Sequence, residues 1–171
     1  MSVAIPPPGF TYGCSVTPSA ADLELATGLV TEAARIAAEI RAEGALAARA
    51  KSNVSDLVTA ADVAAEKFVV GELAARRPDD GVLGEEGAFA NGTSGRRWVI
   101  DPVDGTYNFA AGSDYWCSAI ALAVDDQPIL GAVAHHASGT VWLGGPESGT
   151  PRPAEALAPQ ADRPRADLTP A

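Results

Sequence analysis

The sequence predicts an α/β protein in which two helices pack on a largely antiparallel sheet. Apolar residues recur at helical spacing in two segments of the first half of the chain, about 22–44 and 59–77. From residue 82 onward, short apolar segments alternate with turn residues, a pattern typical of strands. The chain has 171 residues and 47% hydrophobic content, so it is long and apolar enough to bury a core.

The two helices are bounded by recognisable start and stop residues. The first is expected to begin with Asp22 as its cap and to end at Gly44. The second is expected to begin near Thr59, because Thr59 and Asp62 resemble a capping box with Asp in place of Glu. Pro78 ends it. The apolar side of the first helix is formed by Leu25, Leu29, Ala33, Ile36 and Ile40.

The second half of the chain predicts a sheet. A short strand at Val82-Leu83 leads into Gly84, and a strand at residues 97–100 leads into Asp101. Three further apolar segments suggest an antiparallel meander with turns at 125–128 and 137–139: Cys117–Val124, Ile129–His135 and Thr140–Leu143.

The charge balance excludes some partners. Twelve basic residues face 22 acidic ones, for a net charge of −10. Nucleic acids and anionic membranes need concentrated Lys and Arg, so neither is expected as a partner. Only two cysteines occur, Cys14 and Cys117, in no CxxC spacing, which favours a reduced, cytoplasmic location. Neither a signal peptide nor a membrane-spanning apolar segment is visible.

Composition divides the chain into three parts. Residues 1–19 are rich in Pro, Gly and Ser and predict a flexible N-terminal arm. Residues 20–145 contain the helices and strands of an α+β domain. Residues 146–171 are rich in proline and poor in bulky apolar residues, so this stretch has little capacity to fold alone.

The segment Asp101-Pro102-Val103-Asp104-Gly105-Thr106 is a candidate metal-binding loop. Pro102 stiffens the backbone between the two carboxylates, and Gly105 lets it turn sharply. Carboxylates held this close repel each other unless a cation lies between them, and oxygen ligands suit Mg²⁺. The alternative is an ordinary turn, since Asp-Pro and Asp-Gly pairs are common in turns.

Four other acidic or basic residues have both a functional and a structural interpretation. Glu85 and Glu86 follow a short strand and could be solvated, or they could add a third carboxylate to the site. One of them, not both, should point inward, because neighbouring strand side chains face opposite ways. Asp62 could cap a helix or hydrogen-bond a catalytic hydroxyl. Lys51 is isolated, and an isolated lysine is usually a surface charge.

Together these segments resemble the inositol monophosphatase family. The resemblance rests on Lys51, on Asp56-Leu57-Val58-Thr59-Ala60-Ala61-Asp62, on Gly84-Glu85-Glu86 and on residues 98–109 in that order, and it extends from about residue 20 to about residue 145. The pair Asn108-Phe109 looks like the branch that acts on inositol phosphates, and Ala111 departs from the usual polar residue. The resemblance implies a layered α/β sandwich of the inositol-phosphatase and sugar-phosphatase type.

The resemblance also implies a metal-assisted mechanism. Mg²⁺, or Mn²⁺ in its place, would support hydrolysis of a phosphate monoester, with myo-inositol monophosphate as the expected substrate. Glu85, Asp101 and the Val103 carbonyl would hold the first ion. Asp101 and Asp104 would share the second. Thr106, activated through Asp62, would position the attacking water together with Glu85.

Further roles follow from the same resemblance. Asp104, Gly105 and Thr106 would meet the phosphate, and Lys51 would belong to a mobile loop that approaches the metals. The substrate would be a small phosphorylated polyol, and a homodimer is the usual assembly of the family.

One part of the family pattern is missing. Relatives have a second half with a Trp-Asp motif that completes the second metal site, and no such motif follows Thr106 here. Residues 163–168 resemble the link toward that half. We therefore expect an N-terminal fragment, a truncated gene product or a shortened homologue, with a weak second metal site and an uncovered apolar face.

Two alternatives to an inositol monophosphatase stay open at this stage. The chain could be a non-catalytic remnant that binds a metal ion or a full-length partner. It could also apply the same chemistry to histidinol phosphate, fructose bisphosphate or a nucleotide phosphate.

Overall fold

The computed structural model describes residues 16–48, 54–146 and 151–154, with only the backbone described at 45–48 and 54–59. Most of the expected N-terminal arm (1–19) and of the proline-rich link (146–171) lies outside these residues. Lys51 lies outside them as well.

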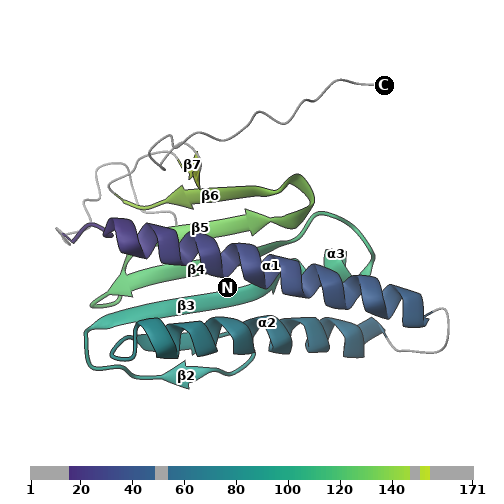
Figure 1. The fold of residues 1–171 in the computed structure, drawn as a ribbon, viewed down its shortest axis with the longest axis horizontal. Coiled ribbons are helices and arrows are strands. Elements are labelled where there is room, and N and C mark those ends of the chain that lie inside the picture. The colour runs from purple at the N-terminus through teal and green to yellow at the C-terminus, as the bar shows by residue number, and fades with distance from the viewer. Residues whose placement is uncertain (1–15, 49–53, 147–150, 155–171) are drawn as a thin grey trace, which may run out of the picture.

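Two long helices cover one face of a sheet (Figure 1). The helices α1 (Ala20–Ala48) and α2 (Val54–Arg76) lie side by side, and the short α3 (Thr106–Ala110) follows the third strand. In the described part of the chain the sheet has seven strands in the order β2-β1-β3-β4-β5-β6-β7. Their bounds are β1 Gly81–Gly84, β2 Phe89–Ala90, β3 Arg96–Asp104, β4 Cys117–Val124, β5 Gln127–His135, β6 Thr140–Gly144 and β7 Arg152–Pro153.

The sheet is mixed but mainly antiparallel, which confirms the predicted fold class. Strands β3 to β7 pair antiparallel in chain order, while β1 pairs parallel with β3. The turn between β4 and β5 is shorter than expected. Asp125 and Asp126 take the left-handed conformation (φ 49° and 61°), as a two-residue hairpin turn requires, so Gln127 already belongs to β5.

The core lies between the helices and the sheet. Trp98, Leu122 and Phe109 are at most 1% exposed, and small residues of α1 such as Ala26 and Ala37 are fully buried, which lets the helix approach the strands closely. The opposite face of the sheet carries no described element. There Leu83, Val99, Val133 and Trp142 are each 36–43% exposed, and their registers place them on one side.

The start of α1 differs from the expectation. Ser19, not Asp22, is the cap: the N–H of Asp22 donates to Ser19 Oγ (3.2 Å), and the N–H of Ser19 donates to Asp22 Oδ2 (2.9 Å). These reciprocal bonds form a capping box with Asp at its third position.

The start of α2 was also placed too late. The helix begins at Val54, so Asp62 lies in its interior and cannot be the capping-box partner of Thr59. No helix in the described part of the chain has both the length and the apolar character needed to span a bilayer.

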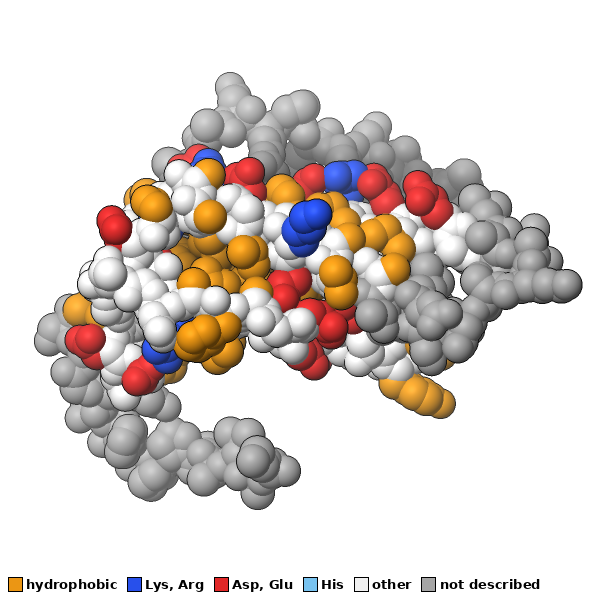
Figure 2. Space-filling model, turned by 90° about the horizontal axis from the view of Figure 1, so that it is seen from below, with side chains coloured by type: hydrophobic (Ala, Val, Ile, Leu, Met, Phe, Trp, Pro, Cys, Tyr) orange, Lys and Arg blue, Asp and Glu red, His pale blue; other side chains and the backbone are white. Residues whose placement is uncertain are grey.

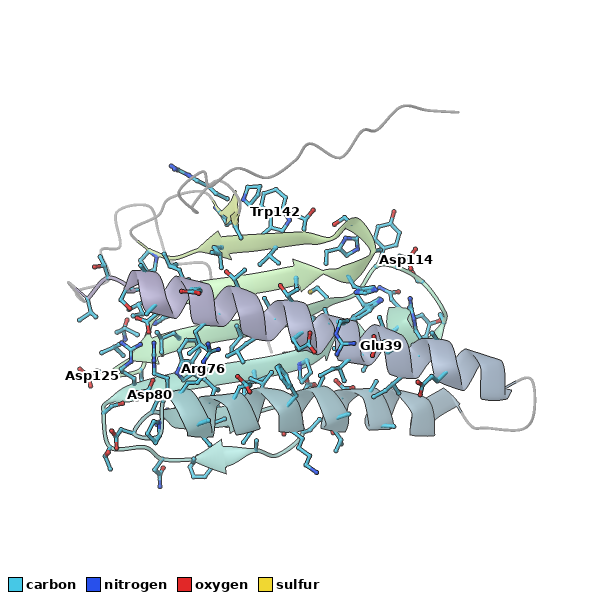
Figure 3. The ribbon with its side chains drawn as sticks, in the orientation of Figure 1. Glu39, Arg76, Asp80, Asp114, Asp125 and Trp142 are labelled. Atoms are coloured by element: carbon cyan, nitrogen blue, oxygen red, sulfur yellow. The ribbon has the colours of Figure 1, made fainter. Side chains whose placement is uncertain are left out.

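An ion cluster ties α1 to one end of the sheet. The Asp22 carboxylate pairs with Arg96 and with Arg77 (3.4 Å), and Asp80 accepts a hydrogen bond from Trp98 Nε1 (2.9 Å). Burial opposes ionisation of Asp22, but the bonds from Ser19 and the two arginines outweigh it and lower its pKa. Figure 3 shows Asp80 at this end of the sheet and Asp114 at the other, where α3 lies.

Candidate metal and phosphate site

Two carboxylates meet because β1 and β3 run parallel. The carboxyl ends of neighbouring parallel strands lie at the same edge of a sheet, and Gly84 is in register with Ile100. Glu85 directly follows Gly84, and Asp101 directly follows Ile100. The N–H of Glu85 donates to the carbonyl oxygen of Ile100 (3.2 Å), which continues the pairing one residue past the end of β1.

Helix α2 adds two more acids to the same region. Asp62 and Glu66 lie four residues apart, so they share one side of the helix. Both are buried, at 3% and 6% exposure. Glu66 accepts hydrogen bonds from the backbone N–H groups of Glu86 (2.9 Å) and Ala88 (3.0 Å). In the view from below, acidic side chains gather near the middle of the molecule, beside hydrophobic ones (Figure 2).

The pKa of Asp62 reflects its burial and the negative charges around it. Burial raises the pKa of its carboxyl to about 7, and the charges of Glu86, Glu85, Asp101 and Glu66 add to the effect. A group with this pKa is partly protonated near neutral pH. It would become fully ionised if a cation were bound beside it.

Asp101 has the same character. Its pKa is raised to about 7 by burial, by hydrogen bonding with Glu85 and by the charges of Glu85 and Asp104, while the N–H of Val103 acts in the opposite direction. Its Oδ1 atom is buried and has no hydrogen-bond partner among the described residues. An unpartnered buried carboxylate oxygen among other carboxylates fits a hard cation such as Mg²⁺, which takes oxygen ligands.

The candidate ligands lie near one another but do not converge on one point. Among the described residues, no three His, Cys, Asp or Glu side chains converge closely enough to hold a metal ion. Glu85 and Asp104 are exposed, and the Asp104 carboxylate accepts a weak bond from Cys117 Sγ (3.8 Å).

The segment after Asp104 forms a sharp turn into α3. Gly105 has φ 92° and ψ 38°, a left-handed conformation that favours glycine, and a Cβ there would lie 3.2 Å from the carbonyl oxygen of Tyr115. Asn108 Nδ2 donates to the same oxygen (2.8 Å). Thr106 is exposed at the start of α3, and among the described residues no hydrogen bond links it to Asp62.

Arg41 of α1 anchors the loop that follows α3. Its guanidinium lies over the rings of Phe109 and Trp116, 5.1 and 5.5 Å from their centroids. It also donates to the carbonyl oxygen of Ser113 (2.7 Å) and pairs with Asp114 (3.3 Å). The loop whose backbone contacts Gly105 and Asn108 is therefore fixed from the helical layer.

Asp62, Glu85 and Asp101 lie close together in the structure. Next to them, Asp104 ends β3, Gly105 forms the turn and Thr106 begins α3. Val103 is buried between them in β3. The expectation that only one of Glu85 and Glu86 points inward assumed a continuing strand. Both residues lie in a turn, so strand alternation does not apply to them.

Glu66 was not predicted from the sequence as part of the site. Its only local indication was its position four residues after Asp62, on the same side of a helix, and such a pair is also typical of a solvated helix face. Its partners, the N–H groups of Glu86 and Ala88, lie 20 and 22 positions further along the chain.

Comparisons with known proteins agree with this geometry. Residues 20–150 match the sequence model of the inositol monophosphatase family. The chain is 46% identical over 85 residues to a histidinol-phosphatase of Mycobacterium tuberculosis, covering 50% of this chain and 33% of that protein. It is 38% identical over 131 residues to an inositol-1-monophosphatase of Mycobacterium leprae, covering 68% and 45%.

A solved structure agrees as well. Inositol monophosphatase-II of Staphylococcus aureus superposes with a TM-score of 0.65 at 27% identity, over 88% of this chain and 55% of that one. The chain thus spans about half the length, or less, of the proteins it matches.

Proposed function

The chain belongs to the inositol monophosphatase family, and on this premise we propose that it supplies the metal- and phosphate-binding part of a Mg²⁺-dependent phosphatase. The observation that carries the proposal is the group of carboxylates from α2, from the turn after β1 and from the end of β3. The buried, unpartnered Oδ1 of Asp101 lies among them. A site of this composition attracts a divalent cation before it attracts a phosphate.

In the proposed site, Glu85, Asp101 and the Val103 carbonyl would hold one ion, and Asp101 and Asp104 would hold a second. Mn²⁺ substitutes for Mg²⁺ because the ligands are all oxygens. A bound ion of this kind lowers the pKa of a coordinated water and screens the charge of the substrate phosphate.

The chain's own groups do the remaining work. Glu85 accepts the proton of the attacking water, and the Thr106 hydroxyl orients that water, with Asp62 behind it as hydrogen-bond acceptor. The N–H groups of Gly105 and Thr106 donate to phosphate oxygens, since the first N–H groups of a helix have no partner within it. Lys51 lies outside the described residues; its proposed place is in a mobile loop that approaches the metals.

The proposed substrate is myo-inositol monophosphate, a small phosphorylated polyol. Asn108-Phe109 after the turn supports this choice. A second candidate is histidinol phosphate, supported by the 46% identity to a protein named histidinol-phosphatase. Fructose bisphosphate and nucleotide phosphates are the remaining members of the panel to be tested.

The test is release of inorganic phosphate by the 171-residue chain. Wild type, Asp104→Asn and the surface control Asp126→Asn are compared with each ester in the presence of Mg²⁺. We expect release by the wild type and the control, fastest with inositol 1-phosphate, and its loss in Asp104→Asn. A preference for histidinol phosphate would replace the substrate. A folded wild type that binds Mg²⁺ but releases nothing would favour the non-catalytic alternative.

Two further expectations, a homodimer and a cytoplasmic location, stay predictions. The homodimer is tested by light scattering of the purified chain. The cytoplasmic location, which rests on cysteine usage, is tested by fractionation.

A further inference from the structure

Glu66 is a buried acid whose two oxygens are both used. At 6% exposure, its Oε2 accepts from the N–H of Glu86 (2.9 Å) and its Oε1 from the N–H of Ala88 (3.0 Å). The same turn is closed by a bond from the N–H of Gly84 to the carbonyl oxygen of Ala88 (2.8 Å). Residues 84–88, here called the Glu85 turn, are thus held by one side chain of α2.

Gly84 makes room for this carboxylate. A Cβ at Gly84 would lie 2.1 Å from Glu66 Oε2 and 2.5 Å from its Cδ, closer than any real contact. Gly84 is not among the described residues with positive φ, so the need for a left-handed conformation does not account for a glycine here. Its lack of a side chain is therefore explained by the approach of Glu66, and the two residues form a complementary pair.

Stability alone does not explain an acid at this position. Glu66 lies one helical turn from Asp62, whose ionisation its charge opposes, and like charges at this spacing destabilise a helix. Two N–H donors side by side need two acceptor oxygens, however. A carboxylate supplies both, whereas the amide of glutamine supplies one acceptor and one group of donors.

We propose that Glu66 is a positioning residue that holds the Glu85 turn so that the Glu85 carboxylate faces Asp101, an inference that rests on the proposed function. The turn is fixed on its other side by the bond from the N–H of Glu85 to Ile100 (3.2 Å). With both anchors in place, Glu85 needs little reorganisation to coordinate a divalent ion beside Asp101. Residues that orient metal ligands in this way typically change metal affinity by 10–100-fold when replaced.

The first experiment measures Mn²⁺ affinity by calorimetry on metal-free 171-residue chain, well below its unfolding temperature. Glu66→Gln keeps the size of the side chain, and Glu72→Gln is the matched control, because Glu72 is an exposed acid of the same helix paired with Arg76. We expect about tenfold weaker binding in Glu66→Gln and wild-type binding in Glu72→Gln. Equal affinities in the two variants would overturn the proposal.

The second experiment uses Gly84→Ala. The added methyl group must displace the Glu66 carboxylate, so Gly84→Ala should weaken Mn²⁺ binding as Glu66→Gln does. In the double variant Glu66→Ala/Gly84→Ala the clash is gone, and the loss should be no greater than that of Glu66→Ala alone. Strictly additive losses would contradict the pairing of the two residues.

Amide hydrogen exchange separates this inference from the proposed function. The N–H groups of Glu86 and Ala88 should be protected in wild type and Glu72→Gln and should exchange faster in Glu66→Gln. Unchanged protection would overturn the positioning role even in an active enzyme. A wild type that binds no Mn²⁺, with the expected exchange pattern, would instead overturn the proposed function and leave the anchoring of the turn supported.

Discussion

The N–H of Glu85 donates to the carbonyl oxygen of Ile100 at 3.2 Å, one residue beyond the last strand pair of β1 and β3. This bond carries the parallel pairing up to the candidate site. It explains how two acids that lie 16 positions apart, Glu85 and Asp101, come to share one edge of the sheet. Their proximity, rather than either residue alone, is what favours a cation.

Replacing Asp101 should have opposite effects with and without metal. In EDTA at pH 8, Asp101→Asn should unfold at the same or a higher temperature than wild type, because it removes one charge from a crowded, partly buried group. Its Mn²⁺ affinity should fall at least about tenfold, or about 1.4 kcal/mol. Thermal unfolding followed by circular dichroism, with and without Mn²⁺, gives both quantities.

The control for this experiment is Asp126→Asn. Asp126 forms an exposed pair with Arg97 (2.7 Å) far from the carboxylates of the site, so its variant should keep the full stabilisation by Mn²⁺. If Asp101→Asn is stabilised by Mn²⁺ as much as Asp126→Asn, Asp101 is not a ligand.

The pKa values of Asp62 and Asp101 predict a pH-dependent stability. Both are raised to about 7 from 3.8, so between these values the folded state binds more protons than the unfolded state. The free energy of unfolding should therefore fall as pH rises from about 4 to about 7 and change little from these groups above that. Urea unfolding in EDTA should show a lower midpoint at pH 8.0 than at pH 5.5.

Two comparisons isolate the contribution of these two acids. The variant Asp62→Asn/Asp101→Asn should lose most of the difference in urea midpoint between pH 5.5 and pH 8.0. The histidines of the chain are unchanged in this variant, so the loss reports the two acids. Added Mn²⁺ should raise the wild-type midpoint more at pH 8.0, where fewer protons compete for the carboxylates. A wild type equally stable at both pH values would argue against the raised pKa values.

Sequence patterns predicted the elements well because their causes are local. The 3.6-residue period of α1 and the apolar segments of β3 to β6 are visible without knowledge of the fold. The start of α2 was misplaced for the same reason. The Thr59-Asp62 spacing matches a local capping box, but Asp62 packs toward Glu85 and Glu86 instead, and tertiary packing decides where the helix begins.

The site was less accessible to sequence reasoning where its contacts are non-local. Parallel pairing of β1 with β3 depends on a register between distant residues, and no turn residue in the sequence indicates it. The role of Glu66 depends on backbone N–H groups that only the fold brings within reach. Asp101 and Glu85 could be named from the motif, while the residue that holds Glu85 could not.

The capping box at the start of α1 should be coupled to the ion cluster. Ser19→Ala removes the capping bond from the N–H of Asp22 and the bond that the Ser19 hydroxyl donates to the Asp22 carboxylate (2.8 Å), and it should lower the free energy of unfolding by about 1 kcal/mol. Asp22→Asn should cost more, because it also leaves Arg96 and Arg77 without their shared, buried partner. Urea unfolding at pH 7 measures both, and Glu32→Gln, at an exposed pair on the same helix, should change stability by less than about 0.5 kcal/mol.

The order of these three effects is the decisive result. If Asp22→Asn is no more harmful than Ser19→Ala, the contacts with the two arginines contribute nothing to stability and the cluster is only a surface feature.

Arg41 should stabilise the loop beside the turn that we propose binds phosphate. Arg41→Met keeps the apolar stem over Phe109 and Trp116 but removes the cation and the bond to the Ser113 carbonyl. We expect a loss of about 1–2 kcal/mol in the free energy of unfolding. Because the same loop contacts Gly105 and Asn108, the KM for the phosphate ester should rise more than kcat falls.

Arg97→Met is the matched control for Arg41→Met, since Arg97 forms an exposed pair with Asp126 and touches no aromatic ring in the described residues. Its loss should stay within about 0.5 kcal/mol. Of the three tryptophans, Trp116 is the one that lies against Arg41, so Arg41→Met should alter the tryptophan emission more than Arg97→Met does. Equal stability of the two variants, with unchanged fluorescence, would mean that the loop keeps its place without Arg41 and that the turn at Gly105 is held by its own backbone contacts.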